Sequence, residues 1–220
     1  MSDEDRSSPG GSDFIVTLVH AEVSRVDESG TTRLLRIPYL QSGVAVRDGA
    51  QMVTTLPFPH RGRTALSSEG LAVVFSGEPE VLQYDRTGAL LRRMRFPAFD
   101  LTLDEAVVDS TRQAALAEAA TPELREIIQT SYSLPAPERR PTFEEVRADG
   151  DHLVLGLHRV WTSGGRKPWL FVSPGERRAG VLRLAEGERI LDVEGDRVLV
   201  AGTTPAGVPQ VTLLEIEDWT

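Results

Sequence analysis

Cysteine and asparagine are both absent from this 220-residue chain. Without cysteine the chain has no disulfide framework, no thiolate zinc site and no cysteine nucleophile. No stretch approaches the roughly 20 apolar residues of a membrane helix, so we expect no membrane span. The first twelve residues are polar and lack the apolar segment of a signal peptide. The sequence therefore leaves the cellular compartment undetermined, and we take the cytoplasm as the default expectation.

Basic residues are fewer than acidic ones, which limits the partners that the chain is expected to bind. The formal net charge is -9, with 33 acidic against 24 basic residues. A nucleic-acid groove needs a basic stripe to neutralise phosphate, and anionic membranes attract basic clusters. We therefore expect no nucleic-acid partner. Hydrophobic residues make up 40% of the chain, enough for a core, so residues 14–220 are predicted to fold behind a disordered polar tail at 1–13.

Short apolar runs separated by turn residues dominate the chain. Runs of this length, rich in valine, leucine and aromatics, are typical of strands, and Pro38 is expected to end one of them. The sequence therefore predicts an all-β fold. The predicted strands cover 14–19, 21–27, 34–37, 44–46, 52–56, 71–75, 81–84, 90–96, 143–147, 153–161, 169–172, 181–184, 190–193, 198–201 and 210–216.

Residues 102–132 break the strand pattern. Apolar residues there recur at helical spacing, and the segment Ala114–Ala120 is rich in the best helix former. Thr121, Pro122 and Glu123 supply an N-cap, a first-position proline and a first-turn acid. We predict two short helices, inserted between strands.

Two turn patterns recur among the strands. In the first, an acidic residue and a glycine precede an apolar run, as at Gly49, Gly70, Gly150 and Gly195. In the second, two strands flank a polar turn with glycine, as at Asp27–Gly30 and Asp85–Gly88, with a looser copy around Gly175. Where the two alternate, successive hairpins form a four-stranded antiparallel meander. Such meanders of about 40–50 residues are typical of β-propeller blades.

The spacing of these turns fits blades only in part. Gly150 and Gly195 lie 45 residues apart, and the 80 residues from Gly70 to Gly150 shrink to a similar length without the helical insertion. The 21 residues from Gly49 to Gly70 are too few for a blade. A β-sandwich or an open sheet with ordinary turn glycines is the alternative.

The segment Tyr84-Asp-Arg-Thr-Gly-Ala-Leu-Leu-Arg-Arg93 resembles the outer hairpin of the NHL/TolB-like six-bladed β-propellers, and 169–175 resembles a degenerate copy. The order of a blade, a helical insertion, a Leu-Pro turn at Leu134, an Asp-Gly turn at Asp149 and a last blade is similar to the C-terminal half of such proteins from environmental bacteria. The resemblance implies a partial propeller of about three to four blades over residues 14–220. It also implies secreted or cell-surface relatives.

Three or four blades do not by themselves make a six-bladed ring, and the last blade lacks an outermost strand after Glu217. Three interpretations follow: a truncated fragment of a larger propeller, a half-propeller that pairs with a second copy, or a small closed form. Since unclosed edges invite pairing with another chain, we expect homo-oligomers through unclosed blade edges.

Motifs for catalysis are sparse. The four histidines show no metal-binding spacing, and no Gly-x-Ser-x-Gly elbow is present. Some six-bladed propellers are lactonases with a cation held by glutamate, asparagine and aspartate, but this chain has no asparagine. We predict a non-enzymatic binding module without cofactor or metal, for an unknown protein or small molecule. A metal-dependent hydrolase or lactonase is the alternative.

Loops before inner strands line the face of a propeller on which ligands bind. The residues predicted to contact a ligand there are Arg61, Arg63, Arg139, Arg140, His158 and Trp161.

Overall fold

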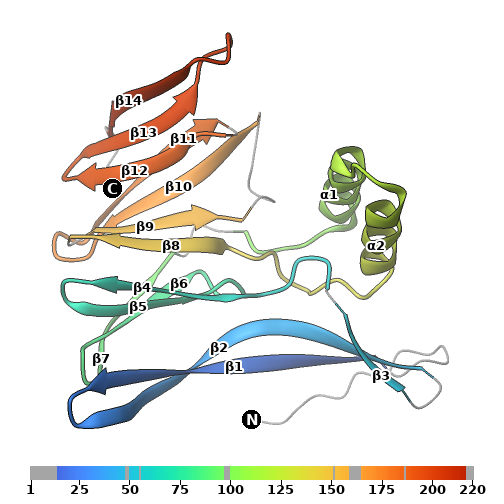
Figure 1. Cartoon of the computed structure of the whole chain (residues 1–220), viewed down its shortest axis with the longest axis horizontal. Helices are drawn as coiled ribbons and strands as arrows, with labels where there is room; N and C mark the ends of the chain where they lie inside the picture. The colour runs from blue at the N-terminus through green and yellow to red at the C-terminus, as the bar shows by residue number, and fades with distance from the viewer. Residues whose placement is uncertain are drawn as a thin grey trace. The chain divides into compact units, whose positions relative to one another are not determined.

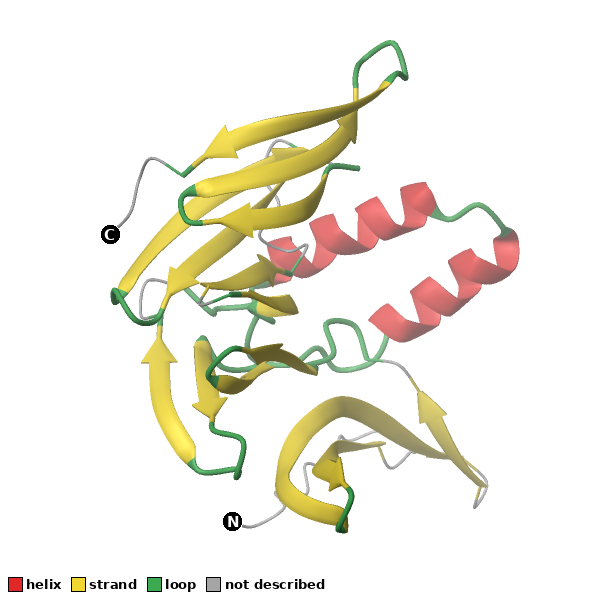
Figure 2. Cartoon of the chain, turned by 60° about the vertical axis from the view of Figure 1, so that its left-hand side comes forward, coloured by secondary structure: helices red, strands yellow, loops and turns green. Residues whose placement is uncertain are grey.

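The computed structural model describes residues 14–47, 50–54, 56–96, 100–150, 152–158, 165–185 and 187–216. It is mostly β, in four antiparallel sheets with two short helices (Figures 1 and 2). The chain divides into two compact units, residues 1–62 with 100–141 and residues 63–99 with 142–220. No described helix is long and apolar enough to cross a membrane.

The first unit contains a three-stranded sheet and the helical insertion. The sheet has the order β1-β2-β3, with β1 at Phe14–Asp27, β2 at Gly30–Arg47 and β3 at Ala50–Thr54. The helices are α1 at Glu105–Glu118 and α2 at Pro122–Tyr132. The Thr121 hydroxyl accepts the Leu124 N–H at 3.2 Å, so the predicted cap of the second helix is confirmed.

The prediction that Pro38 ends a strand is wrong. β2 continues through Pro38, which lies opposite His20 beside a register shift in the β1–β2 ladder. An irregularity of this kind tolerates a residue without a backbone N–H. The strands predicted separately at 14–19 and 21–27 are therefore one long strand, β1.

The second unit holds three sheets. Their strands are β4 at Gly62–Ser67, β5 at Gly70–Phe75, β6 at Glu80–Tyr84 and β7 at Leu90–Arg95; β8 at Phe143–Asp149, β9 at His152–Leu157, β10 at Arg166–Ser173 and β11 at Arg178–Ala185; and β12 at Arg189–Glu194, β13 at Arg197–Thr203 and β14 at Pro209–Glu215. Each sheet is a meander of sequential strands, four, four and three in number. Figure 1 shows them one after another, coloured from turquoise to red.

Apolar side chains join the three sheets face to face. On β9 and β10, Leu153, Leu155 and Leu170 pack into one core cluster with Ala72 and Val81 of the sheet β4–β7. The alternate residues of β9 and β10 pack into a second cluster with the sheet β12–β14; they are Val154, Trp169 and Phe171. Since side chains alternate along a strand, the sheet β8–β11 is covered on both faces.

The first strands of the three sheets are also linked. Arg63 Nε on β4 donates to the Glu144 carbonyl on β8 at 2.9 Å. Arg147 on β8 donates to the Ile190 carbonyl on β12 at 3.0 Å, and the Val193 N–H donates to the Asp149 carboxylate at 2.9 Å. Each sheet is therefore tied to the next along its first strand.

The recurring glycines lie in the hairpin turns between the first and second strands. Gly70 has φ +145°, and a Cβ there would meet the Tyr84 carbonyl oxygen at 2.0 Å, so only glycine fits. Gly150 and Gly195 occupy the corresponding turns with positive φ. The turn predicted at Gly49 lies outside the described residues.

Candidate functional site

The predicted ligand-contacting arginines divide between the two units. Arg61, Arg139 and Arg140 lie in the first unit, and Arg63 and His158 in the second. Trp161 lies outside the described residues. The structure therefore gives no single site that contains all of these residues.

In the first unit, Arg61 and Arg139 belong to connected loops. Arg61 forms an isolated bridge with Leu40, and Arg139 forms one with Thr102. The buried ring of His60, next to Arg61, lies with its Nε2 3.0 Å from the Arg139 carbonyl oxygen. The structure thus brings these two of the predicted residues into one cluster of loops.

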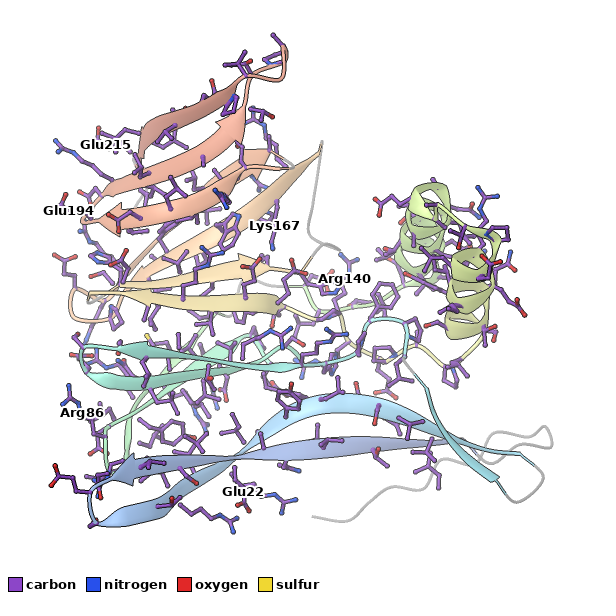
Figure 3. The ribbon with its side chains drawn as sticks, viewed as in Figure 1. Glu22, Arg86, Arg140, Lys167, Glu194 and Glu215 are labelled. Carbon is purple, nitrogen blue, oxygen red and sulfur yellow. The ribbon has the colours of Figure 1, made fainter. Side chains whose placement is uncertain are left out.

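Arg140 is anchored in the same loops. Its backbone N–H donates to the Leu101 carbonyl at 2.8 Å, and its guanidinium donates to the Thr102 carbonyl and lies 3.9 Å from the Asp104 carboxylate. Figure 3 labels it. These contacts connect the segment before the two helices to the segment after them, so Arg140 stabilises the base of the helical insertion.

In the second unit, Arg63 and His158 form hydrogen bonds with strand β8 and with the residue just before it. The prediction that Arg63 lies in a loop is wrong, because it belongs to β4 and donates to the Glu144 carbonyl. The segment Gly62–Ser67 has few strong β formers and was not predicted as a strand; the sheet pairing determines it. The His158 backbone N–H donates to the Thr142 carbonyl at 2.7 Å.

A charged cluster surrounds Trp169 in the same unit. Lys167 Nζ donates to the carboxylates of Glu144 and Glu145, the latter at 2.9 Å, and lies 4.7 Å from the centre of the Trp169 ring. Arg147 lies 5.7 Å from that ring and 3.2 Å from the Glu145 carboxylate. Burial raises the pKa of Glu145, but the hydrogen bond and charge of Lys167, with those of Arg147, outweigh it and leave the pKa lowered.

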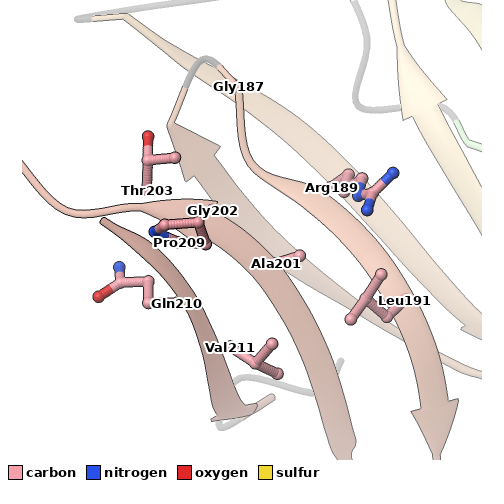
Figure 4. A pocket seen from close by; sticks show the side chains of 9 residues that line it. All are labelled: Gly187, Arg189, Leu191, Ala201, Gly202, Thr203, Pro209, Gln210 and Val211. Carbon is pink, nitrogen blue, oxygen red and sulfur yellow. The ribbon is translucent and has the colours of Figure 1, made fainter. Parts of the chain in front are cut away.

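A hollow that the sequence did not predict lies over β12, β13 and β14 (Figure 4). Its volume is about 450 Å³, within the range of ligand sites. The residues that line it are Gly187, Arg189, Leu191, Ala201, Gly202, Thr203, Pro209, Gln210 and Val211.

The chemistry of this hollow is apolar with one cation. Leu191 is 45% exposed and Val211 60% exposed, so both present apolar surface to solvent. The Arg189 guanidinium forms no ion pair or hydrogen bond with any described residue. Thr203 adds a hydroxyl at one end, where Gln210 also lines the hollow. The expectation that the last blade lacks an outermost strand was the only sequence signal for an uncovered surface here.

No group of three or more histidine, cysteine, aspartate or glutamate side chains suited to a metal ion occurs in the ranges that the structure describes.

Comparisons with protein-family models, with curated proteins and with solved structures found no match to this chain. The resemblance to six-bladed propellers, and the single partial propeller domain over 14–220, therefore remain predictions.

Proposed function

We propose that this chain is a binding module that acts without catalysis, on a scaffold of three propeller-type blades, and that it binds a small amphipathic carboxylate in the hollow over β12–β14. The observation that carries the proposal is the Arg189 guanidinium beside the apolar side chains of Leu191 and Val211. An arginine holds a carboxylate through charge-assisted hydrogen bonds, while the apolar wall takes up a hydrocarbon chain.

Two features support the blade interpretation. The sheets are four-stranded or three-stranded meanders in sequential order, and the middle one is covered on both faces by its neighbours. In addition, successive first strands are bonded to each other, as the strands around a propeller axis would be. In such a scaffold the exposed face of the last sheet is the position that a further blade or a ligand takes.

Hexanoate and its uncharged analogue hexanamide make a matched pair of probes. In an NMR titration of the ¹⁵N-labelled full chain, we expect hexanoate to shift the amides of Ala201, Gly202 and Val211, with affinity in the millimolar range. Hexanamide should bind about tenfold more weakly, because it lacks the ionic contact.

Arg189→Gln should lower the affinity for hexanoate to that for hexanamide. Arg183→Gln removes the same charge from an exposed position on β11 and should leave binding unchanged. Hexanoate that shifts none of these amides, or that binds Arg189→Gln equally well, would overturn the proposal.

A further inference from the structure

The outer edge of β14 is open. β14 ends the order β12-β13-β14, whereas the other two sheets of this unit each have a fourth strand. No described strand pairs with that edge, and six of the seven residues of β14 are exposed. Val211 is 60% and Leu213 59% exposed, so the edge carries apolar side chains into solvent.

The ladder fixes which backbone groups of β14 face outward. The Ile216 N–H donates to the Asp196 carbonyl at 2.8 Å at the end of the β13–β14 pair. Hydrogen-bonded and non-hydrogen-bonded pairs alternate along an antiparallel ladder. The N–H and C=O groups of Val211, Leu213 and Glu215 therefore point away from β13.

The usual protections of an edge strand are missing from β14. Proteins protect edges with charges, bulges or proline within the strand. The β13–β14 ladder has no register shift, the one charged residue of β14 is Glu215 at its end, and its proline is its first residue. β1, the long edge strand of the first unit, has two register shifts and several charged residues.

We propose that two copies of this chain pair through β14, antiparallel about a two-fold axis at Thr212. In this register Thr212 faces its own copy, Val211 faces Leu213 and Pro209 faces Glu215, so no charge opposes a like charge. The Val211–Leu213 pairs exchange their outward N–H and C=O groups, and Glu215 donates to Pro209, for about six hydrogen bonds between chains. The two three-stranded sheets become one of six strands.

This pairing is self-complementary, as a two-fold interface requires. It places Val211 and Leu213 of both copies on one face, the face of the hollow, where they cover one another at the new junction. Since it uses the edge of β14 and not Arg189, it does not depend on the carboxylate proposed above.

Sedimentation velocity of the full chain tests the association. We expect twice the monomer mass of 24.1 kDa at concentrations on the order of 10–100 μM. Val211→Lys should weaken association at least tenfold, because each lysine then faces Leu213 of the other copy and lies diagonally across from the second lysine. Val181→Lys is the matched control, since Val181 is 53% exposed on the edge strand β11.

A chain that stays monomeric over this range would overturn the dimer. A dimer that survives Val211→Lys but dissociates with Val181→Lys, or with Val16→Lys on β1, would place the contact on another strand and would also overturn it. A monomer that still binds hexanoate would leave the proposed ligand site standing.

Single cysteines test the register, because the natural chain has none. Across a non-hydrogen-bonded pair the Cα atoms lie about 4.5 Å apart, within the range for a disulfide. Thr212→Cys should therefore form a covalent dimer under mild oxidation. Gln210→Cys faces Leu214 in this register and should cross-link at least tenfold less; equal cross-linking of the two variants would overturn the axis at Thr212.

Discussion

The sheets β8–β11 and β12–β14 belong to the same unit, but their surroundings differ. The first contributes alternate residues of β9 and β10 to two core clusters, so these central strands are buried on both faces. The second buries one face through Val198 and Val200 and leaves the other, with Leu191 and Val211, in solvent. Of these two sheets, β12–β14 is therefore the one with apolar surface available to a ligand or partner.

The same contrast is visible in the sequence of the strands. β9 and β10 read as continuous apolar runs, as strands covered on both faces do. β14 is exposed, yet it also carries apolar residues, Val211 and Leu213, on its open face, as a strand covered on that face would. Four predictions test this contrast between covered and uncovered parts of the molecule.

The largest expected effect comes from truncating the central sheet. Phe171 is fully buried between the two sheets, so Phe171→Ala should lower the free energy of unfolding by about 3–5 kcal/mol. Val211→Ala on β14 should change it by less than about 0.5 kcal/mol when the protein is dilute enough to be monomeric. Urea denaturation of both variants measures this, and similar losses would show that the open face is packed after all.

Enlarging a residue in the central sheet should cost less than truncating one. A Cβ at Gly156 would lie 3.0 Å from the Trp169 ring and 3.1 Å from the Glu145 Cβ. Because Trp169 is itself held between strands and the charged cluster, Gly156→Ala should destabilise by about 1–3 kcal/mol.

Gly175→Ala is the matched control, since a Cβ there meets nothing within 4 Å. Thermal denaturation should show a lower midpoint for Gly156→Ala alone. A midpoint equal to that of the natural chain would mean that the Trp169 ring moves freely.

Much of the fold follows from local signals. The cap at Thr121 and the proline after it predicted where α2 begins, and this is confirmed. Side chains alternate along β7 in the same way: Arg92 pairs with Glu69, whereas Arg93 and Arg95 both pair with Glu80.

What the sequence did not predict depends on contacts between distant residues. The course of β2 through Pro38 and the strand β4 are determined by pairing rather than by propensity. A Cβ at Gly62, the first residue of β4, would meet the Pro38 carbonyl oxygen at 1.9 Å, a close approach that spacing along the chain cannot reveal. The hollow beside Arg189 similarly requires the registers of three strands.

The pH dependence of stability should also separate the two sheets. The pKa of Glu145 is lowered from its ordinary value of 4.5: burial acts against this, but Lys167 and Arg147 outweigh it. A carboxylate with a lowered folded-state pKa stabilises the fold above its unfolded-state pKa, and this contribution is lost as the pH falls through the folded-state value.

Glu145→Gln should therefore be less stable than the natural chain at pH 7, and the difference should shrink as the pH falls below about 4.5. Urea denaturation at a series of pH values measures this. Glu215→Gln on the exposed strand β14 should stay within about 0.5 kcal/mol of the natural chain. A Glu145→Gln difference that grows on acidification would contradict the assigned cause.

Substitutions on β7 should have the smallest effect on stability but should change self-association. This edge strand differs from β14 because it carries Arg93 and Arg95, which both pair with Glu80, at 3.6 and 3.2 Å. Exposed ion pairs contribute about 0–1 kcal/mol each, so replacing both arginines with valine should cost little stability. It should, however, make β7 an apolar edge like β14, and in a Val211→Lys background it should restore concentration-dependent association in sedimentation experiments. Replacing Arg86, in the turn between β6 and β7, and Arg125 on α2 with valine removes the same charge outside the strands. If that control associates equally, the protection of β7 comes from net charge and not from the place of its arginines.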